Sequence, residues 1–86
     1  MKVVAKNIEV IAHFTEEGKI YPIKFKVKEG DNYQVVRILK VISTDLEKLC
    51  GNMMRVFVCN VIINNVEKIC EIKYDIEGTK WMLFKI

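Results

Sequence analysis

Side chains that carry most enzymatic chemistry are scarce in this chain. Among its 86 residues there is one histidine, His13, and one serine, Ser43, and neither lies in a catalytic motif such as a nucleophile elbow. The four glycines stand apart from one another, so no glycine-rich phosphate-binding loop is present. Because catalysis needs positioned acids, bases or nucleophiles, we expect a protein that is not an enzyme. An enzymatic alternative would require a pocket that gathers His13 with Glu9, Asp45 or a cysteine.

Cysteine is also sparse, and its spacing argues against a disulfide framework. Cys50, Cys59 and Cys70 are odd in number and lack C-x-x-C spacing, which suits free thiols in a reducing compartment. Together with His13 they could form a Cys₃His zinc site, but structural zinc ligands usually come in close pairs from knuckle turns. We therefore expect no metal and no cofactor, and we keep a small zinc-binding protein as a remote alternative.

The N-terminal region has no long apolar run. Its stretch "MKVVAKNIEVIAHF" is interrupted by Lys6, Asn7 and Glu9, so it resembles neither a signal peptide nor a membrane helix. We therefore expect a cytoplasmic protein without a membrane partner. The length predicts a single domain over residues 1–86, and the net charge of +3 permits an acidic partner without requiring one.

Alternation of apolar and polar residues is the strongest structural signal in the chain, and it predicts β-strands. A first strand has one apolar face, made of Ile8, Val10, Ala12 and Phe14. After a turn at residues 16–19, a second strand covers "PIKFKVKEG", where Pro22 is tolerated near the strand start or on a sheet edge. The third strand, "YQVVRILKVIS" from Tyr33, is apolar on both faces, which is typical of a strand that is central, bent or covered by a partner.

One helical signal follows, in the stretch "TDLEKLCGN". Thr44 and Glu47 form a capping box, and Gly51 suits the position just after a helix. The apolar residues Leu46 and Leu49 recur at helical spacing. The sequence therefore predicts one short helix around residues 45–50.

The last third of the chain reads as two hairpins. If Asn64-Asn65 forms a two-residue turn, the numbers of paired residues sum to 129, so Cys59 faces Cys70 and Phe57 faces Ile72. A second turn at residues 75–78 would pair Tyr74 with Thr79. That pairing brings Trp81 opposite Ile72 and Leu83 opposite Cys70. The two hairpins then share one core face, which consists of Phe57, Cys59, Cys70, Ile72, Trp81 and Leu83.

These elements predict an all-β fold. Six strands joined by short turns form a small meander, which must curl on itself to bury its apolar face. We expect an SH3-like or partly open barrel with the one short helix, and an α+β roll with a longer helix is the alternative.

A row of lysines is the first candidate binding surface. Lys24, Lys26 and Lys28 alternate with apolar residues, and side chains two apart on a strand are about 6.6 Å from each other, a spacing that could follow a phosphate backbone. Arg37 and Lys40 on the next strand would widen the patch, although they point to opposite faces unless a bulge intervenes. The alternative is a solvated row that keeps an edge strand from aggregating, and aromatic side chains are scarce on that face.

A second candidate surface is apolar. It would combine the third strand with the outer side of the later hairpins, through Val36, Ile38, Ile42, Ile62, Ile69, Met82 and Phe84. These are more apolar side chains than a small monomer normally exposes. Either the barrel wraps so that both faces are buried, or the residues form a dimer or partner interface.

Four short strand patterns also carry a resemblance to a known family. They are "PIKF" from Pro22, "YQVVRIL" from Tyr33 after Gly30, "EIKY" from Glu71 and "WML" from Trp81. From Pro22 onward the sequence resembles a family of small, uncharacterised all-β bacterial proteins common in clostridia. More distantly, it is similar to a domain of unknown function found with Y-family translesion DNA polymerases. The resemblance implies an accessory role in an assembly concerned with DNA.

We therefore expect a non-enzymatic binding or accessory module in a protein or nucleoprotein assembly. The candidate contact residues are Lys24, Lys26, Lys28 and Arg37, with the third strand as a site for a protein partner or for self-association. Weak nucleic-acid binding fits the same lysines. The alternative is a structural homodimer without a ligand.

Overall fold

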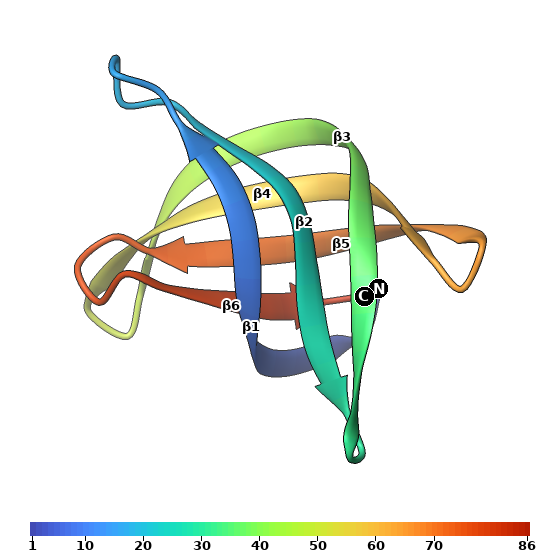
Figure 1. The fold of residues 1–86 in the computed structure, drawn as a ribbon. Helices are drawn as coiled ribbons and strands as arrows, with labels where there is room; N and C mark the ends of the chain where they lie inside the picture. The colour runs from blue at the N-terminus through green and yellow to red at the C-terminus, as the bar shows by residue number, and fades with distance from the viewer.

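The computed structural model describes all 86 residues and contains six antiparallel strands. They are β1 (Val3–Phe14), β2 (Ile20–Glu29), β3 (Asn32–Leu49), β4 (Asn52–Ile63), β5 (Val66–Asp75) and β6 (Lys80–Lys85). Each strand pairs with the next, and β1 also pairs with β6, which closes the barrel (Figure 1). The all-β, six-stranded expectation is confirmed, but the barrel is closed rather than partly open.

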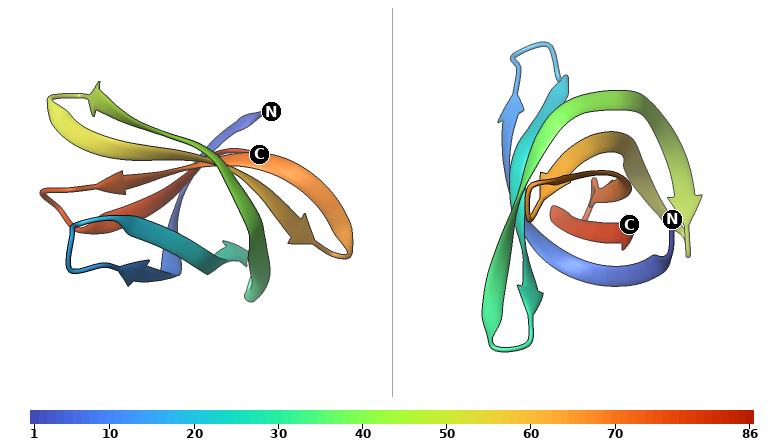
Figure 2. Two further views of the ribbon diagram at one scale, coloured as in Figure 1. Left: turned by 90° about the horizontal axis from the view of Figure 1, so that it is seen from above. Right: turned by 90° about the vertical axis from the view of Figure 1, so that its right-hand side faces the viewer.

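Closure brings the two ends of the chain together. Lys2 and Ile86 exchange backbone hydrogen bonds, with N to O distances of 2.7 and 2.9 Å. In Figure 1, β1 and β2 run vertically in front of β4, β5 and β6, which run across the view. The long β3 bends between these two layers and arches around the later strands (Figure 2). The sheet therefore wraps around its own core without a covering helix.

The core lies between these layers. Its buried residues form one cluster of nine, made of Phe25, Val27, Val36, Phe57, Cys59, Val61, Cys70, Ile72 and Leu83. Five of the six predicted core-face residues belong to this cluster, and Trp81 is partly buried against it. The core face predicted from the two later hairpins is therefore confirmed.

The short helix predicted around residues 45–50 is wrong. Residues 44–49 continue β3, and the hairpin turn is Cys50-Gly51, both with positive φ. A helix of about two turns has little stability of its own, whereas the strand gains a continuous ladder with β4. Glu47, assigned above to a capping box, instead binds Lys73 of β5. Gly51 provides the second left-handed position of the turn.

The later hairpins test the predicted registers directly. The pairing of Cys59 with Cys70 and of Phe57 with Ile72 is confirmed. The second register is wrong by two residues, because Tyr74 pairs with Trp81 and Ile72 pairs with Leu83. The loop between the paired residues Asp75 and Lys80 has four residues, as predicted, but it begins one residue later. Asp75 accepts hydrogen bonds from the backbone N–H groups of Gly78 and Thr79 within this loop. A shift of two residues leaves every side chain on the same side of the sheet, so the predicted core face is unchanged.

Bulges in β3 explain its two apolar faces. The register of β3 against β4 shifts between Ile38 and Lys40 and again between Val41 and Ser43. Val36 is fully buried and Ile38 packs against the core, whereas the bulged residues Leu39 and Ile42 are exposed. Val36 and Ile38 were predicted to belong to an exposed apolar surface, and for these two residues the prediction is wrong.

On the outer side of the later hairpins, Ile69 is exposed, whereas Ile62, Met82 and Phe84 are half-buried. Curvature of the sheet thus removes most of the expected apolar patch. The fold contains no helix that is long and apolar enough to cross a membrane.

Candidate functional site

The three predicted lysines lie on the outer side of the barrel, next to residues of the two flanking strands. Lys24 lies between Ile11 of β1 and Arg37 of β3. Lys26 lies between Glu9 and Val35, and Lys28 faces Tyr33. Because these side chains share one side of three adjacent strands, the lysine row and Arg37 form a single surface.

The bulge in β3 adds Lys40 to this surface. Arg37 pairs with Ile62 and Lys40 pairs with Asn60, and these two partners share the outer side of β4. Without the extra residue Leu39, positions 37 and 40 would face opposite sides. We call the resulting surface the basic face, and it consists of Lys24, Lys26, Lys28, Arg37 and Lys40.

Most of the charge on the basic face is uncompensated. Lys26 forms an ion pair with Glu9, with 3.1 Å between Nζ and Oε2, and its Nζ also lies 4.6 Å from the ring centroid of Tyr33. No carboxylate lies within ion-pair distance of the other four cations of the basic face. The face therefore carries a positive potential that favours an anionic ligand.

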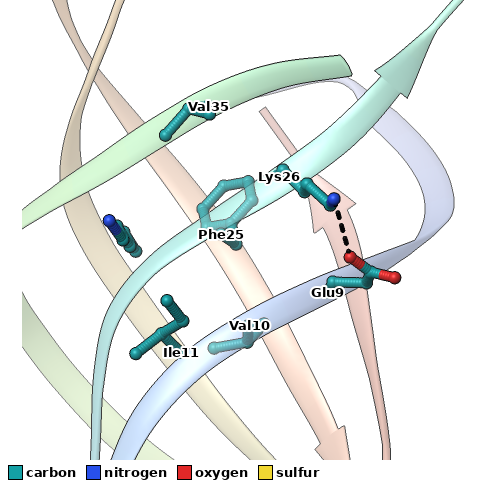
Figure 3. A pocket seen from close by; sticks show the side chains of 7 residues that line it. Glu9, Val10, Ile11, Phe25, Lys26 and Val35 are labelled. Atoms are coloured by element: carbon teal, nitrogen blue, oxygen red, sulfur yellow. Dashed lines mark ion pairs between the residues drawn. The ribbon is translucent and has the colours of Figure 1, made fainter. Parts of the chain in front are cut away.

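Shallow depressions connect these side chains into one trough. A depression of about 430 Å³ is lined by Ile11, Lys24, Val35 and the Lys26–Glu9 pair. Figure 3 shows Val35 and Ile11 on either side of β2, with Lys26 directed at Glu9. A second depression, of about 220 Å³, shares this ion pair and extends to Lys28 and Tyr33.

A third depression, of about 470 Å³, shares Val35 and extends to Arg37 and the Asn64-Asn65 turn. Since neighbouring depressions share lining residues, the three form a continuous trough along the outer side of β1–β4. An open trough with cationic borders can hold an extended anionic chain, whereas enclosing a small molecule requires a deeper pocket.

Aromatic side chains, expected to be scarce, also lie on this side of the sheet. Tyr33 is 57% exposed beside Lys28, and Tyr21 is 49% exposed opposite His13. Simple alternation would place Tyr21 on the inner side of the sheet, with Phe25. Ile23 has no partner on β1, however, and this bulge moves Tyr21 to the outer side. Tyr33 could have been found from the sequence, because alternation places it on the same side as Arg37.

The residues considered for metal binding or catalysis are not gathered. Cys50 lies in the β3–β4 turn, Cys59 pairs with Cys70 inside the barrel, and His13 lies beside Tyr21 on the outside. No group of three or more metal-ligating side chains occurs in the structure. The pKa of the Cys59 thiol is raised by its hydrogen bond with Cys70 and by burial, whereas the pKa of the Cys70 thiol is lowered by the same hydrogen bond.

Lys73 is a buried cation that sequence reasoning missed. It is 2% exposed, and its Nζ donates hydrogen bonds of 3.0 and 3.2 Å to the two carboxylate oxygens of Glu47. Glu71 Oε2 lies 3.7 Å from the same Nζ, and the ring centroid of Phe84 is also 3.7 Å away. These neighbours satisfy the ammonium group, so Lys73 has a structural role and is not a ligand site.

Comparisons with protein-family models, with curated proteins and with solved structures find no match to this chain. The resemblance to small clostridial proteins therefore stays a prediction. The basic face and its trough are the features from which a function can be argued.

Proposed function

We propose that the protein is a non-enzymatic binding module, an SH3-like small barrel that holds an anionic part of a macromolecular partner against its basic face. The observation that carries this proposal is the trough lined by cations, of which only Lys26 has a carboxylate partner. The proposed contact residues are Lys24, Lys26, Lys28, Arg37 and Lys40.

The pairing of Lys24 with Arg37 is the contact that most directly supports an anionic ligand. The two residues are directly paired across β2 and β3, and like charges in this position destabilise a sheet. A bound anion would relieve the repulsion and gain two charge-assisted hydrogen bonds. Solubility alone does not require two cations at opposed positions.

Barrel closure weakens the alternative role of the lysines as protectors of a sheet edge. Edge protection is needed where a strand has unpaired N–H and C=O groups. Lys24 and Lys26 are paired with β1 on one side and with β3 on the other, so they guard no edge, whereas Lys28 is paired with β3 alone. Edge protection therefore does not account for Lys24 and Lys26, which supports a contact function for these two residues.

A charge-reversal experiment tests the proposal. We expect Lys24→Glu combined with Arg37→Glu to weaken binding to a heparin oligosaccharide, used as a generic polyanion, by about tenfold or more. The affinity of the wild-type protein should also fall steeply between about 50 and about 200 mM salt. Binding is measured by titration calorimetry, and amide chemical shifts locate the contact.

The matched control is Lys2→Glu combined with Lys48→Glu, which changes the net charge equally. The N-terminus and the end of β3 lie on the side of the barrel away from β2 (Figure 2). If the control pair weakens heparin binding as much as the Lys24 and Arg37 pair, only net charge matters and the proposal fails. It also fails if the wild-type protein does not bind heparin at the lower salt concentration.

A further inference from the structure

We propose that the anionic partner is a single-stranded nucleic acid, whose phosphates contact the basic face and whose bases stack on Tyr33 and Tyr21. This inference rests on the proposed function and specifies its partner. It depends on a separate observation, namely that exposed aromatic and apolar side chains lie among the cations on the outer side of β1–β3.

Tyr33 provides a stacking surface at one end of the trough. It is 57% exposed and lines the depression that also contains Lys26 and Lys28. Lys26 Nζ lies 4.6 Å from the ring centroid, so one face of the ring is held by a cation. The ring can receive a base, while Lys28 on the neighbouring strand can contact the adjacent phosphate.

Tyr21 provides a second stacking surface further along β2. It is 49% exposed, and its ring centroid lies 6.3 Å from that of His13 with an interplanar angle of 35°. About six residue steps of strand separate Tyr21 from the pair of Lys28 and Tyr33, which corresponds to about 20 Å. An extended strand of several nucleotides can reach both rings, and Lys24 and Arg37 lie along the way.

The middle of this surface is apolar, which favours a single strand over other polyanions. Ile11 and Val35 are each 56% exposed, and Ile23 is 49% exposed. In a duplex the bases are stacked inside and the phosphates cover the outside, so these side chains would contact no apolar group. An acidic polypeptide would neutralise the lysines but would not use two aromatic rings. Unpaired bases offer flat apolar faces next to phosphates, which matches the alternation of both kinds of side chain.

The experiment separates base stacking from charge. The probes are fluorescein-labelled oligothymidylate, oligouridylate and oligodeoxyuridylate of about twelve nucleotides, an abasic deoxyribose-phosphate chain of the same length, and a duplex of the same length. The proteins are the wild type, Tyr33→Ala, Tyr33→Phe and Tyr21→Ala. Fluorescence anisotropy gives each dissociation constant, and a thermal melt shows that each variant is folded.

We expect the single strands that carry bases to bind more tightly than the abasic chain and the duplex. Tyr33→Ala should weaken oligothymidylate binding about tenfold and leave binding of the abasic chain unchanged. Tyr33→Phe, which keeps the ring, should restore the wild-type affinity, and Tyr21→Ala should weaken binding in the same direction as Tyr33→Ala. A difference between oligouridylate and oligodeoxyuridylate, which differ only in the 2′-hydroxyl, would identify DNA or RNA as the preferred form.

Equal affinities for oligothymidylate and the abasic chain, with no effect of either tyrosine substitution, would overturn this inference. The proposed function would stand in that case, provided that charge reversal of Lys24 and Arg37 still weakens binding of the polyanions. Preferential binding of the duplex would likewise overturn the single-strand assignment. Absence of binding to every polyanion would contradict both proposals.

Discussion

Lys73 is the charged side chain most deeply buried in this barrel, and its burial depends on Glu47, 26 residues earlier in the chain. Removing a lysine from water is costly unless its ammonium group keeps hydrogen-bond partners. Glu47 provides both carboxylate oxygens, whereas Glu71 is more distant at 3.7 Å. The stability of the β3–β5 region therefore depends on one carboxylate.

We expect Glu47→Ala to destabilise the protein by about 1–3 kcal/mol, because it leaves a buried cation without its main acceptor. Glu47 is itself half-buried, so water can reach the vacated position and limits the loss to this range. Replacing both members, as Glu47→Leu with Lys73→Met, should recover much of the stability, since no buried charge remains. Urea unfolding followed by Trp81 fluorescence measures the free energy of unfolding.

The control for this prediction is Glu67→Ala, which removes an exposed carboxylate that forms no ion pair. Equal stabilities for Glu47→Ala and the control would show that the ion pair contributes nothing to the folded state. A double variant less stable than Glu47→Ala would show that the buried charges are needed for packing in this region.

At the scale of elements, the turns determine where each strand ends. The β3–β4 turn places Cys50 at φ 50° and Gly51 at φ 86°, and the β4–β5 turn places Asn64 and Asn65 at φ 51° and 61°. Asparagine and glycine tolerate the left-handed region, whereas most other side chains, cysteine included, are strained there. The β3–β4 turn therefore contains one unfavourable residue.

Replacing that residue should stabilise the protein. We expect Cys50→Asn to raise the free energy of unfolding by about 0.5 kcal/mol, because Asn-Gly is the preferred pair for such a turn. In contrast, Gly51→Ala should lower it by about 1 kcal/mol, since alanine is strained at positive φ. Thermal unfolding of the two variants measures both effects. A destabilised Cys50→Asn would show that the cysteine makes contacts that outweigh its backbone strain.

Elements fixed by interactions between residues close in sequence were predicted correctly, whereas elements that depend on residues far apart in sequence were not. Asn64-Asn65 fixes a hairpin through local backbone preference, so its register was predictable from the sequence. The helix prediction around residues 45–50 used equally local signals, but the strand is stabilised by pairing with β4 and by the distant Lys73. The bulges at Ile23, Leu39 and Ile42 were also unpredictable, because alternation alone does not show where a residue is skipped.

The candidate site also has a part that alternation predicts and a part that depends on strand pairing. Alternation correctly placed Lys24, Lys26 and Lys28 on one side of the second strand. The position of Lys40 depends on the bulge at Leu39, and that of Tyr21 on the bulge at Ile23. The sequence thus predicted the charges of the surface, whereas its aromatic component and its full extent required the pairing of three strands.

At the scale of the whole molecule, closure decides which surfaces are available. Pairing of β1 with β6 closes the barrel, but β2 pairs only with residues 32–37 of β3, so residues 38–49 of β3 pair with β4 alone. Association by strand addition could use only such one-sided segments. The homodimer alternative would use this side of β3 or side chains on the outer surface. Its best candidates are the exposed residues of β3, namely Leu39, Ile42 and Leu46.

We expect the protein to be a monomer, because these apolar side chains are dispersed among polar ones. Lys40 lies between Leu39 and Ile42, and Asp45 and Glu47 flank Leu46. A stable interface buries about 800 Å² on each partner, which is roughly a seventh of the 5841 Å² surface of this molecule. Such an area around Ile42 would cover several charged groups without compensating partners, which disfavours association.

Sedimentation equilibrium over a wide range of protein concentrations measures the mass, with Ile42→Lys as the companion variant. We expect the mass of one chain for both proteins, since the substitution lies at an exposed bulge and changes no buried contact. A two-chain mass for the wild type that reverts to one chain in Ile42→Lys would instead establish β3 as an interface. Binding through the basic face would then have to be measured on the dimer, in which two copies of the trough act together and raise the apparent affinity for a long polyanion.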